Sequence, residues 1–202
     1  MDEAYKYKTL DKPHTAEFKD RGSKFLAFAY PVFSQVDIKE RLQQLKKEHP
    51  KANHHCYAWR LGTDGLQYRA NDDGEPSGSA GRPILGQIDS VGLTNVLVVV
   101  VRYFGGTLLG VPGLINAYKT SAADALNAQT TEKWIEELVQ VDFDYPTMGE
   151  VMYLLRQCKA TIYKQDLQLF CVVKAGIPRK YVTEYMAKLS ELRGVTVKPV
   201  KE

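Results

Sequence analysis

Apolar and polar residues alternate from Leu138 to Tyr145, which is typical of a half-buried β-strand. Pro146 suits the first turn of a helix, and apolar residues then recur at helical spacing as far as Leu155. The same two periods continue to the end of the chain. They predict strands at 160–164 and 167–174 with a tight turn at Gln165 and Asp166, a helix from Pro178, and a strand at 195–200. This β-α-β-β-α-β order predicts a ferredoxin-like domain.

The earlier part of the chain is also mixed. A helix is expected over 35–49, with Ser34 and Asp37 in capping-box spacing, and a second helix over 113–128. The run from Asn95 to Phe104 is apolar enough for a strand buried on both faces. The other expected strands are at 5–9, 23–32, 55–61 and 66–70. The pattern therefore predicts the α+β class.

The polar segment at 129–137, QTTEKWIEE, follows a strong helical pattern. Polar, charged segments of this kind are typical of a link between domains. We therefore expect two domains, at residues 1–131 and 132–202.

Composition narrows the class of protein. The chain has 202 residues, of which 44% are hydrophobic and 25% charged, as in ordinary globular proteins. The net charge of +3 is too small to indicate nucleic-acid binding by itself. Three widely spaced cysteines, the acids Asp2 and Glu3 near the start, and the shortness of the longest apolar run predict a cytoplasmic protein without a signal peptide or a membrane partner.

A glycine-rich loop, GGTLLGVPG, lies between the buried strand and the second helix of the first domain. Backbone N–H groups at such a place can hold an anion, and Gly105 and Gly110 have the spacing of a P-loop. Val111 and Pro112 stand where that loop needs Lys and Ser or Thr, so a Mg-nucleotide site of that kind is excluded. An anion site, and a purely structural need for glycine at Gly105, Gly106 and Gly110, both stay open.

Arg102, Tyr103 and Phe104 end the strand beside these glycines. The Arg fork and the aromatic rings would suit RNA. The alternative is that Arg102 pairs with an acid of a neighbouring loop while the two rings pack in the protein.

The second unusual loop, NDDGEPSGSAGRP, carries Asp72, Asp73 and Glu75. These carboxylates could bind a hard cation or act in acid–base chemistry, but they lack the ligand spacing of a calcium loop. Alternatively, they form turns and accept hydrogen bonds from nearby backbone N–H groups. Ser77 and Ser79 lack the strand–turn–helix elbow of hydrolases.

His54, His55 and Cys56 are adjacent on an expected strand, where His54 and Cys56 share one face and His55 lies on the other. Two ligands do not make a structural zinc site. A Cys–His nucleophile pair two residues apart on a strand lacks the usual third group. Ordinary packing or hydrogen bonding is therefore the favoured interpretation, and we predict no metal and no cofactor.

The segments HHCYAW (54–59), DDGEPSGSAGRPIL (72–85) and VVVRYFGGTLLGVPGLINAY (99–118) resemble the signature of the IMPACT family, in its bacterial YigZ-like branch. The resemblance covers essentially the whole chain. It implies a first domain like the second domain of a small-subunit ribosomal protein, and a second domain like the C-terminal domain of elongation factor G. Eukaryotic members are similar over the first domain, and the resemblance implies a role in regulating translation through a binding partner. The chain departs from the family pattern at Val111, Pro112 and Asn116, and these changes weaken a phosphate site.

The sequence therefore predicts a non-enzymatic cytoplasmic protein that binds RNA, the ribosome or a translation-associated protein. The alternative is an enzyme or binding protein for a small phosphorylated or acidic ligand that uses the same loops. The pattern leaves the oligomeric state open. The candidate binding residues are His54, His55, Asp72, Asp73, Glu75, Ser77, Arg102, Tyr103, Gly105, Gly106, Gly110 and Tyr118.

Overall fold

The computed structural model describes residues 3–127 and 129–200. Asp2 and Ala128, which carry sequence predictions, lie outside this part. The chain divides into two compact units, Tyr7–Lys133 and a second that joins Met1–Lys6 to Trp134–Glu202. Residues 3–6 therefore group with the second unit.

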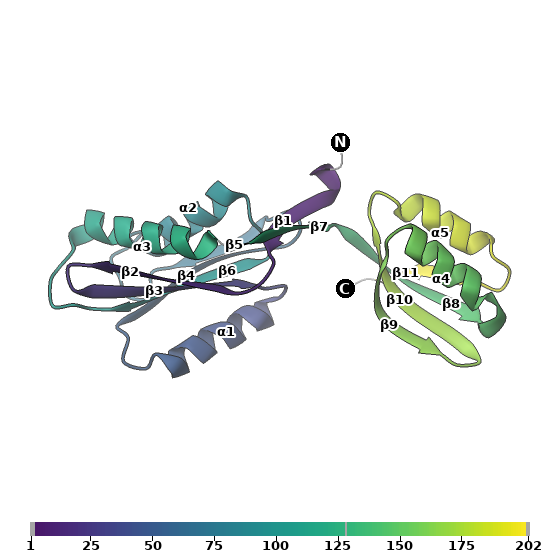
Figure 1. The fold of residues 1–202 in the computed structure, drawn as a ribbon, viewed down its shortest axis with the longest axis horizontal. Coiled ribbons are helices and arrows are strands. Elements are labelled where there is room, and N and C mark those ends of the chain that lie inside the picture. The colour runs from purple at the N-terminus through teal and green to yellow at the C-terminus, as the bar shows by residue number, and fades with distance from the viewer. Residues whose placement is uncertain (1–2, 128, 201–202) are drawn as a thin grey trace. The chain divides into compact units, whose positions relative to one another are not determined.

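A five-stranded antiparallel sheet forms the centre of the first unit (Figure 1). Its middle strand is β6 (Val96–Tyr103), in which every residue from Val96 to Val101 is fully buried. Helices cover both faces, which explains the unbroken apolar run in the sequence. The strand order is β2 (His14–Asp20), β3 (Ser23–Pro31), β6, β4 (His54–Leu61) and β5 (Gln67–Asn71).

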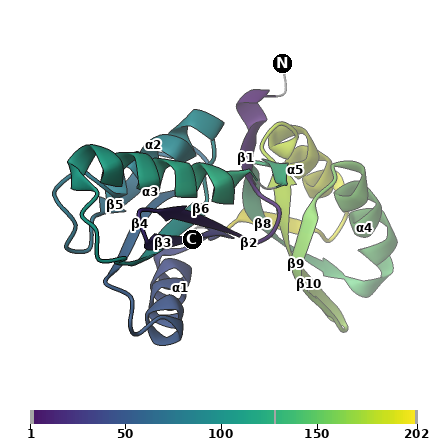
Figure 2. The same ribbon diagram turned by 60° about the vertical axis from the view of Figure 1, so that its left-hand side comes forward.

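One helix packs on one face of this sheet and two pack on the other (Figure 1, Figure 2). The single helix, α1 (Gln35–Glu48), begins with the predicted capping box at Ser34 and Asp37. The opposite face is covered by α2 (Gly81–Val91) and α3 (Gly110–Leu126). Because side chains alternate along a strand, the three inner strands β3, β6 and β4 contribute to both cores, while the edge strands β2 and β5 contribute only to the core under α2 and α3.

The sequence pattern missed β2 and α2. Along β2 no residue is fully buried, so the strand carries little hydrophobic signal. In α2, Gly81, Pro83 and Gly86 interrupt the helical pattern, and the helix begins inside the segment that we expected to be a loop up to Pro83. The expected helix at 113–128 begins earlier, at Gly110.

The expected link at 129–137 contains a strand. β7 (Thr130–Trp134) pairs with β1 (Lys6–Leu10), which follows the short 3₁₀ helix η1 (Glu3–Tyr5). The polar character of β7 indicated a link because the strand is only partly buried and has few apolar positions.

The second unit has the predicted β-α-β-β-α-β order, with one face of its four-stranded sheet covered by two helices (Figure 1). All neighbouring strands are antiparallel, in the order β11-β8-β10-β9. The fold is therefore of the predicted α+β class. Its elements are β8 (Glu136–Asp144), η2 (Tyr145–Thr147), α4 (Met148–Gln157), β9 (Thr161–Leu167), β10 (Phe170–Pro178), α5 (Val182–Glu191) and β11 (Thr196–Pro199).

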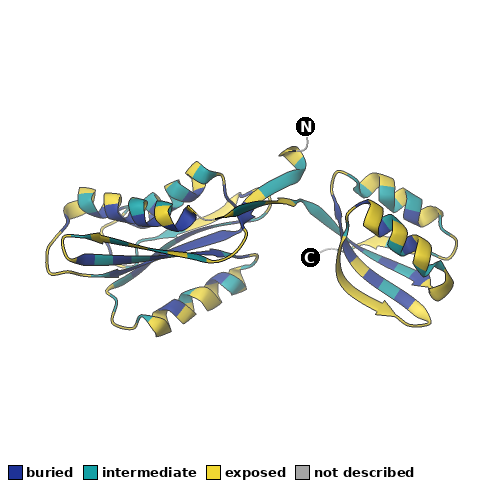
Figure 3. Cartoon of the chain, viewed as in Figure 1, coloured by how far each residue is buried: buried dark blue, intermediate teal, exposed yellow. Residues whose placement is uncertain are grey.

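The hairpin between β9 and β10 turns later than predicted. We expected the turn at Gln165 and Asp166, but β9 continues to Leu167 and pairs there with Cys171. The buried residues of β10 alternate from Cys171 to Ala175 and then continue without a break to Pro178, whereas β9 is exposed along its whole length (Figure 3). The register is therefore set by the apolar face of β10, and the pattern of β9 gave little guidance.

Candidate functional site

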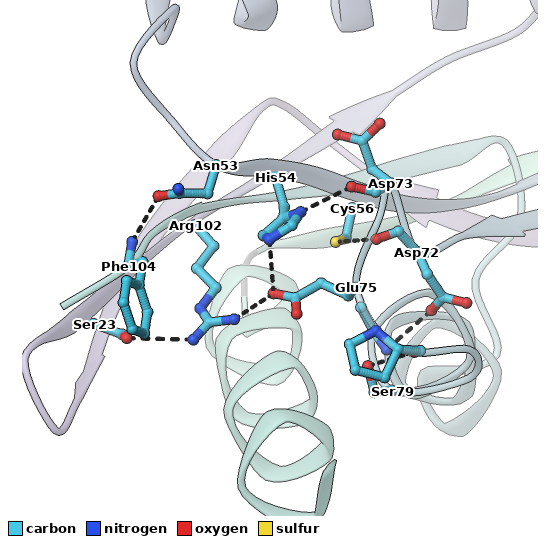
Figure 4. A network of polar contacts seen from close by, with 12 residues as sticks. Ser23, Asn53, His54, Cys56, Asp72, Asp73, Glu75, Ser79, Arg102 and Phe104 are labelled. Carbon is cyan, nitrogen blue, oxygen red and sulfur yellow. Dashed lines mark hydrogen bonds and ion pairs between the residues drawn. The ribbon is translucent and has the colours of Figure 1, made fainter. Parts of the chain in front are cut away.

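The two signature loops of the first unit lie beside each other at one end of the sheet (Figure 4). The acidic loop, residues 72–80, joins β5 to α2, and the glycine loop, residues 104–109, joins β6 to α3. They meet because α2 and α3 pack together on the same face, while β4 and β6 are neighbours in the sheet. The start of β4 brings His54 to the same place.

An ion pair joins the acidic loop to the end of β6, just before the glycine loop. The Nη1 atom of Arg102 donates to Oε1 of Glu75 at 2.6 Å, and the two side chains are only 6% and 3% exposed. The guanidinium lies 5.5 Å from the ring of Phe25 and 5.6 Å from that of Phe104. Arg102 thus pairs with an acid of the neighbouring loop, which is one of the two alternatives that the sequence left open.

Tyr118 of α3 completes this buried cluster. Its hydroxyl donates to Oε1 of Glu75 at 2.7 Å and accepts a hydrogen bond from the thiol of Cys56 at 3.3 Å. Burial raises the pKa of the Tyr118 hydroxyl and of the Cys56 thiol far above their ordinary values. Cys56 is therefore held as an unreactive thiol, because the thiolate is the nucleophilic form.

Asp72 holds the beginning of α2. Its carboxylate accepts hydrogen bonds from the backbone N–H groups of Gly78, Ala80 and Gly81 at 2.9, 3.1 and 2.8 Å. Burial acts to raise the pKa of Asp72, but these three N–H groups outweigh it and hold the pKa below its usual value. Because the N-cap residue itself, Ala80, has no side-chain acceptor, Asp72 supplies the cap from outside the helix.

Asp73 and the two histidines tie the acidic loop to β4. Oδ2 of Asp73 accepts from the backbone N–H of His55 at 2.7 Å, and the Asp73 carbonyl bonds Nδ1 of His54 at 2.9 Å. His54 lies on the α2–α3 side of the sheet and His55 on the α1 side, as predicted from strand alternation. The His55 side chain is buried, which lowers its pKa, while Asp73 acts to raise it.

The three acids of the loop therefore diverge: Asp72 reaches α2, Asp73 reaches β4, and Glu75 reaches Arg102. Residues 3–127 and 129–200 hold no group of three or more His, Cys, Asp or Glu side chains placed to bind a metal ion. Ser77 is exposed, and no hydrogen bond engages its side chain within the described chain. Ser79, by contrast, is buried and donates to the Pro76 carbonyl.

Arg102 and Tyr103 point to opposite faces of the sheet. The Tyr103 hydroxyl lies 2.9 Å from Nδ1 of His49 at the end of α1, while Arg102 lies among the loops of the other face. This separation follows from the alternation of side chains along β6. The two residues therefore do not form one contact group.

The glycines of the second loop have different roles. Gly105 packs so closely on Gly22 that an added Cβ would lie 1.9 Å from the Gly22 carbonyl carbon. Gly106 and Gly110 have φ values of +84° and +70°, which favour glycine. A structural need for glycine is thus present at all three positions.

A pocket of about 420 Å³ opens between the loops. Its lining combines the polar His54, Glu75 and Arg102 with apolar residues of the glycine loop and α3. The sequence had no signal for the apolar part, since these residues read as ordinary loop and helix positions. They are Phe104, Leu108, Leu109, Val111 and Leu114.

The sequence pattern also missed two contacts, one made by Asn53 and one made by Ser23. Asn53 accepts from the backbone N–H of Phe104 at 2.9 Å, and Ser23 accepts from that of Gly105 at 3.2 Å. Both fix the start of the glycine loop, and Figure 4 shows the bond from Asn53 to Phe104. Single polar residues before a strand are common, so no sequence signal distinguished them.

Within the described chain, no helix combines the length and the apolar character that a membrane span requires. The family model of the Impact N-terminal domain matches residues 21–126, which include both loops. IMPACT family member YigZ of Escherichia coli (strain K12) is 35% identical over 184 residues, covering 89% of this chain and 89% of that protein. The protein IMPACT homolog of Saccharomyces cerevisiae is 39% identical over 112 residues, covering 53% of this chain and 42% of that protein. A solved structure described only as that of a hypothetical protein has a TM-score of 0.75 and 32% identity, and the match covers 98% of both chains. The chain belongs to the IMPACT family.

Proposed function

We propose that this protein is a non-enzymatic, cytoplasmic binding protein linked to translation, whose partner is RNA, the ribosome or a translation factor. The link to translation comes from the family, in which the sequence resemblance implies translational regulation by binding. We propose that the two signature loops form the contact surface.

The observation that carries the non-enzymatic part is that the polar groups of the site already bond one another. Asp72 caps α2, Asp73 holds β4, and Glu75 pairs with Arg102. The Cys56 thiol is buried, and burial raises its pKa. A general base must face the substrate with a free proton-accepting atom, and a nucleophile must be activated by a neighbouring group. The hydrogen bonds and the ion pair described above instead favour a structural role for these residues.

Exposed apolar side chains on the glycine loop and the first two turns of α3 support a contact surface there. Leu108 is 82% exposed, and Phe104, Val111 and Ile115 are 45%, 46% and 40% exposed. Large exposed apolar side chains that adjoin one another are typical of interaction sites. Phe104, Leu108 and Val111 also line the pocket between the loops.

The alternative ligand, a small phosphorylated or acidic molecule, has less support. The positive charge of Arg102 is already matched by Glu75, and Pro112 removes one N–H donor from the start of α3. An anion placed in this pocket would lie close to the carboxylate of Glu75.

Co-sedimentation with purified bacterial ribosomes over a salt series tests the proposal. We expect the native protein to bind, and Leu108→Asp to weaken binding by at least about tenfold by placing a charge on the apolar surface. Leu66→Asp is the matched control, because Leu66 is 74% exposed on the same unit but lies outside the pocket. Arg102→Ala is unsuitable, since it would leave Glu75 buried without its partner.

Affinity capture of partners from bacterial lysate, with and without nuclease treatment, distinguishes RNA partners from protein partners. Loss of capture after nuclease indicates RNA or ribosomes, and capture of a translation factor that survives nuclease indicates the protein partner. Absence of both ribosome binding and capture of any translation component would overturn the proposal.

A further inference from the structure

The pocket between the loops has apolar walls and a polar floor. The walls come from Phe104, Leu108, Val111 and Leu114, and the floor from His54 and Glu75. Its volume of about 420 Å³ lies within the range of sites for small organic groups. The chemistry of the floor therefore decides what kind of group fits.

The floor presents hydrogen-bond acceptors. Nδ1 of His54 lies 2.9 Å from a carbonyl oxygen, that of Asp73, and must donate to it. In the neutral ring, this leaves Nε2 of His54 as an acceptor, 3.8 Å from Oε1 of Glu75. Oε1 of Glu75 already accepts from Arg102 and Tyr118, and no donor within residues 3–127 and 129–200 bonds Oε2. Figure 4 shows the Glu75 carboxylate with the His54 ring above it and the Arg102 guanidinium to its left.

The charge of the floor is already balanced. Arg102 and Glu75 form a buried pair of opposite charges, so a further cation or anion would lose its hydration without gaining a free counter-ion. The ligand group should therefore supply hydrogen-bond donors and carry no net charge, and a neutral group with N–H donors does both. It can donate to the open acceptors and adds no net charge.

We propose that this pocket binds a nucleobase that carries an exocyclic amine: adenine, cytosine or guanine. An amine offers two N–H donors at one atom, which matches the acceptors on His54 and Glu75, and the flat ring can stack on Phe104. The hydroxyl of a tyrosine or the N–H of a tryptophan from a protein partner offers one donor and would leave one acceptor unpaired. This inference rests on the proposed function and gives it a chemical specificity.

Titration of the isotope-labelled full-length protein with nucleosides, followed by NMR, tests the inference. Adenosine and purine riboside form the matched pair, because they differ only in the amine, and cytidine and uridine provide a second comparison. We expect adenosine and cytidine to shift the resonances of Leu108, Val111 and Leu114, with binding at least about tenfold tighter than that of purine riboside and uridine.

Two variants locate the binding. Phe104→Leu removes the ring but keeps an apolar side chain, and we expect adenosine to bind several-fold more weakly. The matched control is Tyr68→Leu, since Tyr68 is an exposed ring on β5 outside the pocket. Adenosine affinity should be unchanged in this control.

Equal affinities for adenosine and purine riboside, or no shift at the pocket with any nucleoside, would overturn the inference. Occupation of the pocket by p-cresol or 3-methylindole, mimics of Tyr and Trp side chains, with no response to adenosine would also overturn it and would point to a protein partner. The outcomes for the proposed function are separate. Ribosome binding without nucleoside binding would reject only the pocket assignment, and nucleoside binding without any translation partner would reject only the proposed function.

Discussion

The carboxylate of Glu75 and the guanidinium of Arg102 meet at 2.6 Å in the interior of the first unit, although 27 residues separate them in the chain. Glu75 belongs to the acidic loop, and Arg102 lies near the end of β6, two residues before the glycine loop. The pair thus fixes the relative position of the loops, and Tyr118 adds a third element by donating to the same oxygen. Because both side chains are almost fully buried, the loss of one partner leaves the other charge poorly solvated.

We predict that loss of either partner alone destabilises the first unit strongly. Glu75→Gln or Arg102→Met leaves one buried charge unpaired and should lower the free energy of unfolding by roughly 3–5 kcal/mol. The double variant should lose less than the sum of the two single variants. Urea unfolding in a Trp134→Phe background measures this, because Trp59 then reports on the unit Tyr7–Lys133.

An exposed pair in the same unit provides the control. Arg60 and Asp89 meet at 2.8 Å near the surface, and Asp89→Asn should change stability by less than about 1 kcal/mol. Equal effects of Glu75→Gln and Asp89→Asn, or strict additivity in the double variant, would contradict the prediction.

The sequence predicted much of this fold because burial follows the period of each element. The buried run of β6, the capping box of α1 and the alternation in β8 each carry a local signal. The order of elements in the second unit follows from the same signals. Where a strand is exposed, as β9 is, the local signal is weak, and the predicted turn was misplaced.

The candidate site was predictable in its location and less so in its contacts. The two loops were expected to act together, and the structure brings Glu75, Arg102 and His54 into one cluster. The capping of α2 by Asp72 could not be predicted, because the segment in which α2 begins, at Gly81, was expected to be a loop. Contacts between distant segments depend on packing, and a single sequence carries no signal for them.

Asp72 gives a second prediction. Asp72→Ala removes the acceptor of three backbone N–H groups, and we expect a loss of about 1–2 kcal/mol, with a smaller loss for Asp72→Asn. The pKa of Asp72 lies below its usual value, so its contribution is present at neutral pH and is lost as the pH falls through that lowered pKa. Urea unfolding at neutral and acidic pH should show the native protein and Asp72→Ala converging in acid.

The control for this prediction is Asp124→Asn, because Asp124 is an exposed carboxylate on α3. Its stability should stay within about 0.5 kcal/mol of the native protein at every pH. A constant difference between the native protein and Asp72→Ala down to strong acid would show that the charge of Asp72 does not take part.

A third prediction concerns His55, whose pKa is lowered from 6.5 chiefly by burial. In the unfolded chain the ring takes up a proton as the pH falls below about 6.5, while in the folded protein it resists protonation. Stability is therefore complete above that pH and decreases as the pH falls toward the lowered pKa, by at most about 1.4 kcal/mol per pH unit.

Thermal unfolding between pH 8 and pH 5 checks this. His55→Leu should flatten the pH dependence of Tm. Nε2 of His55 has no partner within the described chain, and the groups that face the ring keep other donors: the Asp73 carboxylate accepts from the backbone N–H of residue 55, and the His49 carbonyl accepts from that of Ala52. An unchanged slope in His55→Leu would show that His55 does not carry the pH dependence and would contradict the prediction.

The glycines provide the fourth prediction: replacement of glycine by alanine should lower the stability of the protein at two sites and raise it at a third. Gly105→Ala would place a Cβ 1.9 Å from a backbone carbon of Gly22, so the strand ends must separate and we expect a loss above about 3 kcal/mol. Gly106→Ala meets no atom but must adopt a φ of +84°, which costs about 1–2 kcal/mol. Gly86→Ala lies within α2, meets nothing within 4 Å, and should stabilise the protein by about 0.5–1 kcal/mol.

Urea unfolding of the three variants, followed through Trp59 in the Trp134→Phe background, gives the comparison directly. The expected order, from the most stable to the least stable, is Gly86→Ala, the native protein, Gly106→Ala and Gly105→Ala. Because Gly105 and Gly106 are adjacent in the chain, a difference between them isolates close packing on Gly22 from the conformational preference of glycine. Equal losses at Gly105 and Gly106 would mean that the φ preference alone decides, and that the contact with Gly22 relaxes without a large penalty.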